Sequence, residues 1–198
     1  MTSPTSESTS PVLRAKPLKI VVAGGFAAGK TTFVDAISEI TPLTTEAPMT
    51  THSLGIDNVG AVTTKTTTTV CMDFGRLTLS ERSILYLFGT PGQDRFWYMW
   101  DELSKGAVGA VVLVDTRRLS DCFPALDYFE AKQIPYLVGL NRFDGQLVHN
   151  PDEVRDALAL PEPIPIVSVD ARSRSSTKEA LLELVRFAIT RRSVAGPD

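Results

Sequence analysis

Apolar runs and helical patterns alternate along the chain and predict its elements. Continuous apolar runs of strand length recur at residues 18–23, 82–88, 107–114, 136–140 and 164–169. Apolar residues at helical spacing occupy the segments between them, at residues 30–40, 96–105, 119–132, 151–158 and 177–191. Strands without polar alternation are buried on both faces of a sheet. The pattern therefore predicts a three-layer α/β domain with an about six-stranded, mostly parallel sheet.

One pair of strands is predicted to run antiparallel. Residues 67–79 are rich in β-branched side chains, and a polar turn at 80–82 joins them to the return strand, which makes a hairpin at one edge of the sheet. Residues 41–66 show no clear period, and a loop of this length in a compact domain is usually functional or mobile. We expect a disordered Ser/Thr-rich tail at 1–16, one domain at 17–192 and a short flexible tail at 193–198.

Composition narrows the function classes. The 198 residues carry a net charge of −3 and their 20 basic residues are scattered, which argues against a nucleic-acid-binding surface. The two cysteines, Cys71 and Cys122, have neither the spacing of a metal site nor that of a disulfide framework. No apolar run approaches the roughly 20 residues that span a bilayer, and no signal peptide or lipidation motif is present. We expect a cytoplasmic protein that reaches a membrane only through partners.

A phosphate-binding motif follows the first predicted strand. Residues 24–31 read Gly-Gly-Phe-Ala-Ala-Gly-Lys-Thr and match G-x-x-x-x-G-K-[ST] between a strand and a helix. Its backbone amides and the helix N-terminus point at an anion. Lys30 is expected to reach the β- and γ-phosphates, and the Thr31 hydroxyl to bind Mg²⁺. The motif assigns nucleotide contacts to Gly25, Phe26, Ala27, Ala28, Gly29, Lys30, Thr31 and Thr32.

Two further segments at strand ends are candidates for base recognition. Asn141-Arg142-Phe143-Asp144 follows the fifth strand, and a carboxylate there accepts from guanine N1–H and its exocyclic amine, a donor pair that adenine lacks. The alternative is a turn that merely favours Asn and Asp. Asp170-Ala171-Arg172 follows the last strand and would reach the base from the same edge of the sheet, with the Ala171 N–H facing the base oxygen.

The order of these motifs resembles a Ras-like small GTPase. Residues 90–93 read Thr-Pro-Gly-Gln, and this variant without a preceding Asp resembles the bacterial MglA branch. Residues 88–100, 139–145 and 169–174 are similar in sequence to the CvnD-type GTPases of actinobacterial conservons. The resemblance covers residues 17–192, which would form one small GTPase domain. It implies GTP or GDP with Mg²⁺ as ligands, slow GTP hydrolysis, and signalling by nucleotide-dependent partner binding.

The same resemblance implies roles for individual residues. Thr69 would be a second Mg²⁺ ligand, although residues 66–68 are also threonines and the run could simply form a strand edge. Gly92 would bond the γ-phosphate through its N–H. Gln93 would orient the attacking water, so that Gln93 and Lys30 are the catalytic candidates.

The sequence departs from the family pattern at several positions. Gly89 stands where an Asp usually reaches Mg²⁺ through water; Asp73 could compensate, or it could be a solvated strand residue. Arg142 replaces the usual Lys, and its stem can still pack across the base. Phe26 replaces a Gly that faces the γ-phosphate, which suggests slow hydrolysis. Arg95 could act as a cis arginine finger or be a solvated residue at a helix start.

Residues 96–100 form an aromatic and methionine run that cannot all face one core. Its exposed members would form a partner surface, because Trp and Tyr are common interface anchors; the alternative is a tightly packed helix. Family resemblance implies a Roadblock/LC7-type protein and a sensor-kinase-like protein as partners. Two other functions stay open, a nucleotide-binding scaffold without significant hydrolysis and a P-loop ATPase or kinase.

Overall fold

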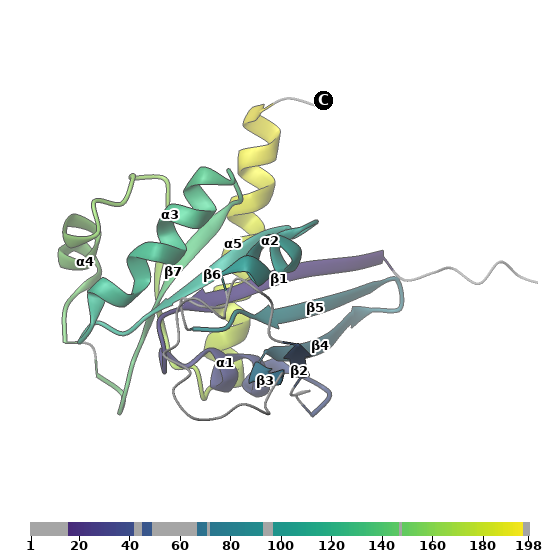
Figure 1. The fold of residues 1–198 in the computed structure, drawn as a ribbon. Coiled ribbons are helices and arrows are strands. Elements are labelled where there is room, and N and C mark those ends of the chain that lie inside the picture. Colours follow the sequence, from purple (N-terminus) through teal and green to yellow (C-terminus); the bar gives the residue numbers. More distant parts are fainter. Residues whose placement is uncertain are drawn as a thin grey trace, which may run out of the picture.

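Six strands form one sheet at the centre of the molecule (Figure 1). The computed structural model describes residues 16–41, 45–48, 67–70, 72–92, 97–146 and 148–195. The strand order is β4-β5-β1-β6-β7-β8, and only β4 and β5 pair antiparallel within this sheet. The strands are β1 Lys16–Gly24, β4 Asp73–Ser80, β5 Ser83–Gly89, β6 Gly109–Val114, β7 Tyr136–Asn141 and β8 Ile166–Val169. The predicted α/β fold with one antiparallel edge strand is confirmed.

Helices cover both faces of the sheet. They are α1 Lys30–Ile37, α2 Tyr98–Ser104, α3 Phe123–Ala131, α4 Pro151–Ala157 and α5 Arg174–Ala195, with a short 3₁₀ helix η2 at Leu119–Cys122. Alternate residues of β1 face opposite helices: Ile20 and Val22 pack in one cluster with α1 and α5, whereas Val21 and Ala23 pack in another with α2, α3 and α4. All four side chains are fully buried, which explains the continuous apolar run.

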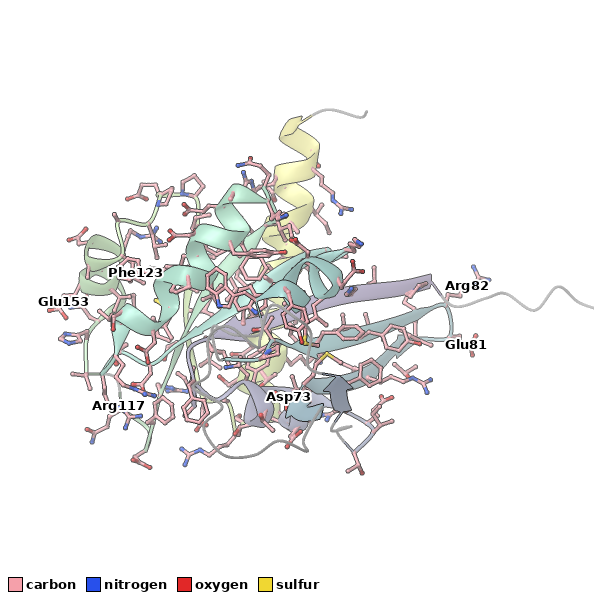
Figure 2. All side chains as sticks on the ribbon, in the orientation of Figure 1. Asp73, Glu81, Arg82, Arg117, Phe123 and Glu153 are labelled. Carbon is pink, nitrogen blue, oxygen red and sulfur yellow. The ribbon has the colours of Figure 1, made fainter. Side chains whose placement is uncertain are left out.

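The hairpin is shorter than predicted, and its first residues belong elsewhere. Strands β4 and β5 turn at Glu81 and Arg82, which lie at the hairpin tip, away from Asp73 at the start of β4 (Figure 2). Residues Thr67–Val70 form β3, which pairs with β2 (Thr45–Pro48) in a separate two-stranded sheet. Strand β2 therefore lies in the segment 41–66, which was predicted to be irregular. The sequence did not predict this strand because it is only four residues long and its pairing partner is distant in sequence.

Several helix boundaries also differ from prediction. Helix α1 ends at Ile37 rather than residue 40, because Ser38 adopts an extended conformation and its hydroxyl bonds to the backbone of Ile40. The helical segment 119–132 is divided into η2 and α3, and a proline stands in the first turn of α3, where its missing N–H is tolerated. Helix α5 begins three residues earlier than predicted and continues to Ala195.

The parallel strands bring their carboxyl ends to one edge of the sheet. Loops at residues 25–29, 115–118, 142–146 and 170–173 follow β1, β6, β7 and β8 at this edge. Ligands of open α/β sheets bind at such an edge. Within the described ranges, no helix is long and apolar enough to cross a membrane.

Candidate nucleotide-binding site

The loop between β1 and α1 has the backbone shape of an anion cradle. Ala27 and Gly29 both have positive φ, 59° and 101°. Gly29 is the N-cap of α1 and provides no side-chain cap, so the first amides of the helix are free for an anion. Gly29 also allows a close approach, because a Cβ there would lie 2.4 Å from Asn141 Nδ2. The predicted phosphate loop is thus formed and lies directly against the predicted base loop.

Lys30 is held beneath this loop. Its Nζ donates to the carbonyl oxygens of Gly24 at 2.9 Å and Gly25 at 2.7 Å, and the residue is only 8% exposed. Burial lowers the pKa of Lys30 to about 8, although the Asp73 carboxylate opposes this shift. A Cβ added to Gly92 would lie 2.7 Å from Nζ, so Gly92 lies beside the ammonium group. Two residues predicted to contact the γ-phosphate therefore meet at one point.

Thr31 and Asp73 meet on the other side of the loop. The Thr31 hydroxyl donates to Asp73 Oδ2 at 2.9 Å. Burial raises the pKa of Asp73, and the bond from Thr31 and the charge of Lys30 oppose this. Asp73 pairs directly with Gly89 across β4 and β5, and a Cβ on Gly89 would lie only 2.7 Å from Asp73 Oδ2. Asp73 is therefore partly buried, and its carboxylate occupies the space beside Gly89. Its compensation for the missing Asp at position 89 stays a prediction.

Asn141 connects the phosphate loop to the last strand. Its Nδ2 donates to Ala28 O at 3.1 Å, and its Oδ1 accepts from Ala171 N at 3.2 Å. The side chain is buried, and both bonds join segments more than 25 residues apart in sequence. In this structure the Ala171 N–H is engaged by Asn141, so its predicted bond to a base oxygen stays a prediction.

The predicted base contacts surround one cavity of about 130 Å³. Beside it, Arg172 donates from its backbone N and its Nε to Asp170 Oδ1 at 3.0 and 3.1 Å, and these bonds lower the pKa of Asp170. Asp144 has φ of 55°. The cavity is lined by Gly29, Thr32, Asn141, Arg142, Phe143, Asp144, Asp170, Ala171 and Arg172. Segments from three separate parts of the sequence thus converge where the base was expected.

Sequence reasoning missed a fourth segment at this edge, the loop after β6. Asp115 directly follows β6, and its side chain is buried and paired with Arg117. Arg118 Nη2 donates to Phe26 O at 2.9 Å, at the crest of the phosphate loop. A Cβ on Gly25 would lie 2.5 Å from Asp121 Cβ, so η2 also packs on the loop. The available signal was the position of Asp115 at the carboxyl end of a central strand.

Some predicted residues lie outside the described part of the chain. These are Gln93, Arg95 and Thr66. Thr69 belongs to β3, where it pairs with Glu46, and the expectation of a strand for the threonine run holds for Thr67–Val70. Metal binding by Thr69 and water orientation by Gln93 stay predictions.

The aromatic run is split between surface and core. Trp97 and Tyr98 are 38% and 39% exposed, whereas Trp100 is 3% exposed and packs against Tyr128 and Phe129. Trp97 stacks on Trp100 with ring centroids 5.4 Å apart. The expectation that the run cannot all face the core is confirmed for these residues, while Phe96 lies outside the described ranges.

Comparisons with known proteins agree with this geometry. The model of a family described as conserved hypothetical ATP binding protein matches residues 22–191. The uncharacterized protein MJ1339 of Methanocaldococcus jannaschii is 31% identical over 134 residues, which are 67% of this chain and 74% of that protein.

Solved structures show the same fold at low identity. The crystal structure of the G domain of the T. maritima FeoB iron transporter has a TM-score of 0.60 and 17% identity, covering 87% of this chain and 99% of that one. The cytosolic domain of the same transporter in apo form has a TM-score of 0.60 and 16% identity, and the match covers 87% of this chain but 64% of that one. With its phosphate loop, G-domain fold and a family match over most of its length, the chain belongs to the family of conserved hypothetical ATP binding proteins and is a nucleotide-binding P-loop NTPase.

Proposed function

We propose that this protein is a guanine-nucleotide switch that binds GTP or GDP with Mg²⁺ and hydrolyses GTP slowly. One observation carries the proposal: Asn141 bonds both to the phosphate loop and to the β8 loop, and Asp144 lines the same cavity three residues later. A carboxylate in that position accepts from guanine N1–H and the exocyclic amine. Adenine presents no such pair of donors and would leave the carboxylate without partners.

The residues beside the phosphate loop suit Mg²⁺. Mg²⁺ is bound by oxygen ligands, usually one or two carboxylates or hydroxyls with phosphate oxygens and waters. The Thr31 hydroxyl and the Asp73 carboxylate are oxygen groups already in contact with one another. We assign the ion to Thr31, with Asp73 in place of the carboxylate missing at position 89. When bound, Mg²⁺ would neutralise charge on the β- and γ-phosphates.

The surroundings of Phe26 support slow hydrolysis. Its side chain is 63% exposed at the crest of the loop, and a Cβ on Gly92 would lie 3.1 Å from Phe26 Cα. The Phe26 backbone therefore lies next to Gly92, the residue expected to contact the γ-phosphate. We propose that the exposed Phe26 ring restricts entry of an arginine from an activating protein. We propose that Gln93 orients the water and Lys30 stabilises charge on the phosphates. Turnover below about 1 per second, the lower end of kinase rates, is expected.

Partner binding would be the output of the switch. Trp97 and Tyr98 are exposed and follow Gly92 and Gln93 by only a few residues in the sequence. We propose that this surface docks a Roadblock/LC7-type protein linked to a sensor-kinase-like protein. We propose that the GTPase is of the MglA and conservon type because its sequence motifs resemble those of that group.

An ATPase or kinase is the second candidate function, and the description of the matching family as ATP-binding favours it. That function needs a base site that accepts adenine. The cavity offers adenine the Asp144 carboxylate, which suits donors at N1 and C2 rather than the acceptor at adenine N1. A scaffold that binds nucleotide without hydrolysis is a third candidate.

Competition for a fluorescent GDP analogue tests the base preference. GDP should displace the probe at micromolar or lower concentration, whereas ATP and ADP should require at least about 100-fold more. Asp144→Asn offers a donor in place of one acceptor, so it should weaken GDP and improve xanthosine diphosphate, which has a carbonyl at C2. Equal displacement by ADP and GDP would overturn the guanine preference and favour the ATPase or kinase. Absence of turnover in the wild type, unchanged by Gln93→Ala, would establish the scaffold.

A further inference from the structure

Asp115 and Arg117 form a two-pronged ion pair at the end of β6, in which Asp115 is buried and Arg117 is half-exposed. Arg117 Nε donates to Asp115 Oδ1 at 2.8 Å and Nη2 donates to Oδ2 at 2.8 Å, while the Arg117 backbone N–H donates to Oδ1 at 3.0 Å. The Asp115 side chain is only 4% exposed, and these bonds hold its pKa below the ordinary value. Bidentate pairs of this kind fix the plane of the guanidinium as well as its position.

The fixed guanidinium lies over the base loop. Its central carbon is 4.1 Å from the ring centroid of Phe143, a cation–π stack. Phe143 O in turn accepts from Gln146 N at 3.2 Å, which closes the turn that contains Asp144. Arg117 and Asp144 line one cavity of about 310 Å³, adjacent to the cavity assigned to the base. Figure 2 shows Arg117 on the side of the molecule where these loops meet.

We propose that Arg117 is a positioning residue for base recognition. It connects the end of β6, which is held in the sheet, to the loop that carries Asp144. The inference rests on the proposed guanine specificity and adds a residue that no base-contact motif contains. Arg117 itself need not touch the nucleotide. Its role is to hold the Phe143 ring, and through it the backbone on both sides of that ring.

The base loop needs such a support because its own conformation is costly. Asp144 has a left-handed backbone with φ of 55°, which Asp tolerates better than most residues with a Cβ but which still costs free energy. A turn of this kind persists only where surrounding contacts fix it. The Asp115–Arg117–Phe143 stack supplies those contacts from a central strand of the sheet. Lysine could keep the charge but not the flat, bidentate geometry.

The test compares GDP with inosine diphosphate, which has the same phosphates and lacks only the exocyclic amine. Wild-type protein should prefer GDP by at least about tenfold, the value of one good polar contact. Arg117→Ala should reduce that preference below about threefold. Arg117→Lys should lie between them. Arg82→Ala, at the exposed hairpin tip, is the matched control and should keep the full preference.

A double-mutant cycle separates positioning from general destabilisation. Phe143→Ala should lower the preference as Arg117→Ala does, and the double variant should be no worse than either, because both act through one stack. Additive losses would overturn the inference, as would equal weakening of GDP and inosine diphosphate in Arg117→Ala. A wild type that does not distinguish GDP from ADP would instead reject the proposed function, and the inference with it.

Discussion

Asp73 and Gly89 are directly paired on the neighbouring strands β4 and β5, and the residue at each position limits which side chain the other position can hold. A side chain at position 89 would collide with the Asp73 carboxylate, which already contacts Thr31. We predict that Asp73→Ala weakens the Mg²⁺ dependence of GDP release: chelating Mg²⁺ should accelerate release at least about tenfold in wild type and less than about threefold in the variant, since a Mg²⁺ carboxylate ligand has been lost. Stopped-flow dissociation of the fluorescent analogue measures this.

The exchanged pair Asp73→Gly with Gly89→Asp is the decisive companion variant. It returns a carboxylate to the same space from the other strand, so it should recover most of the Mg²⁺ dependence. Asp35→Asn is the control, because Asp35 is exposed on α1 and close enough to affect the pKa of Asp73. Full Mg²⁺ dependence in Asp73→Ala would show that the carboxylate is structural only.

Cys122 reports on the packing of η2 against the phosphate loop. Its thiol is buried and donates to Leu119 O at 3.0 Å, and burial raises its pKa to about 12. The thiolate is the reactive form. In a Cys71→Ser background at pH near 8, we predict that iodoacetamide labels Cys122 at least about 100-fold more slowly in folded than in denatured protein.

Saturating nucleotide should slow this labelling further, because η2 contacts the loop through Asp121. Mass spectrometry of quenched samples gives both rates. Labelling of the folded protein at the denatured rate would mean that η2 opens freely and does not support the loop.

Helix α2 carries core and surface residues within one turn. Trp100 is enclosed by Tyr128 and Phe129, whereas Tyr98 is exposed. We predict that Trp100→Ala lowers the free energy of unfolding by about 3–5 kcal/mol, as truncation of a buried aromatic does. Tyr98→Ala should change it by less than about 0.5 kcal/mol. Urea unfolding followed by circular dichroism measures both, and a similar cost for the two would contradict the division of this helix into core and surface sides.

Elements with a clear apolar pattern of their own could be predicted from sequence, and those recognisable only through a distant partner could not. The apolar runs of β1, β6 and β7 predicted central strands because residues on both faces are buried. Strand β2 is defined by its pairing with β3, about 20 residues away in the chain. Its own sequence shows no periodicity that would predict a strand. The end of α1 depends on the Ser38 hydroxyl, a single local bond that propensity does not register.

The residues of the candidate site likewise fall into those that the sequence predicted and those that it did not. Contiguous motifs identified the phosphate loop and the Asn141–Asp144 loop, because their chemistry lies within a few residues. The roles of Asp73 and Arg117 depend on which strands are neighbours and in which register, and this information is not local. The role of a single polar residue at a strand end can therefore be inferred only once its neighbours in the assembled sheet are known.

At the scale of the whole molecule, nucleotide should join parts of the chain that now meet through few bonds. Asn141 links Ala28 to Ala171 by two side-chain hydrogen bonds, across more than 140 residues of sequence. A ligand at 100 times its Kd stabilises the folded state by about 2.7 kcal/mol. In a domain of this size each kcal/mol raises Tm by about 2–4 °C. We predict that GDP with Mg²⁺ raises Tm by about 5–11 °C and that the same concentration of ADP raises it by less than about 2 °C.

Asn141→Ala should lower Tm without ligand and abolish the GDP-induced rise, because it removes both bonds that hold the phosphate loop to the β8 loop. Asn150→Ala is the matched control. Asn150 caps α4 through a bond from the Glu153 N–H, and losing a cap costs about 1 kcal/mol. Its Tm should fall as well, yet its GDP-induced rise should equal that of wild type. If both variants kept the full rise in differential scanning fluorimetry, nucleotide binding would not depend on the link through Asn141.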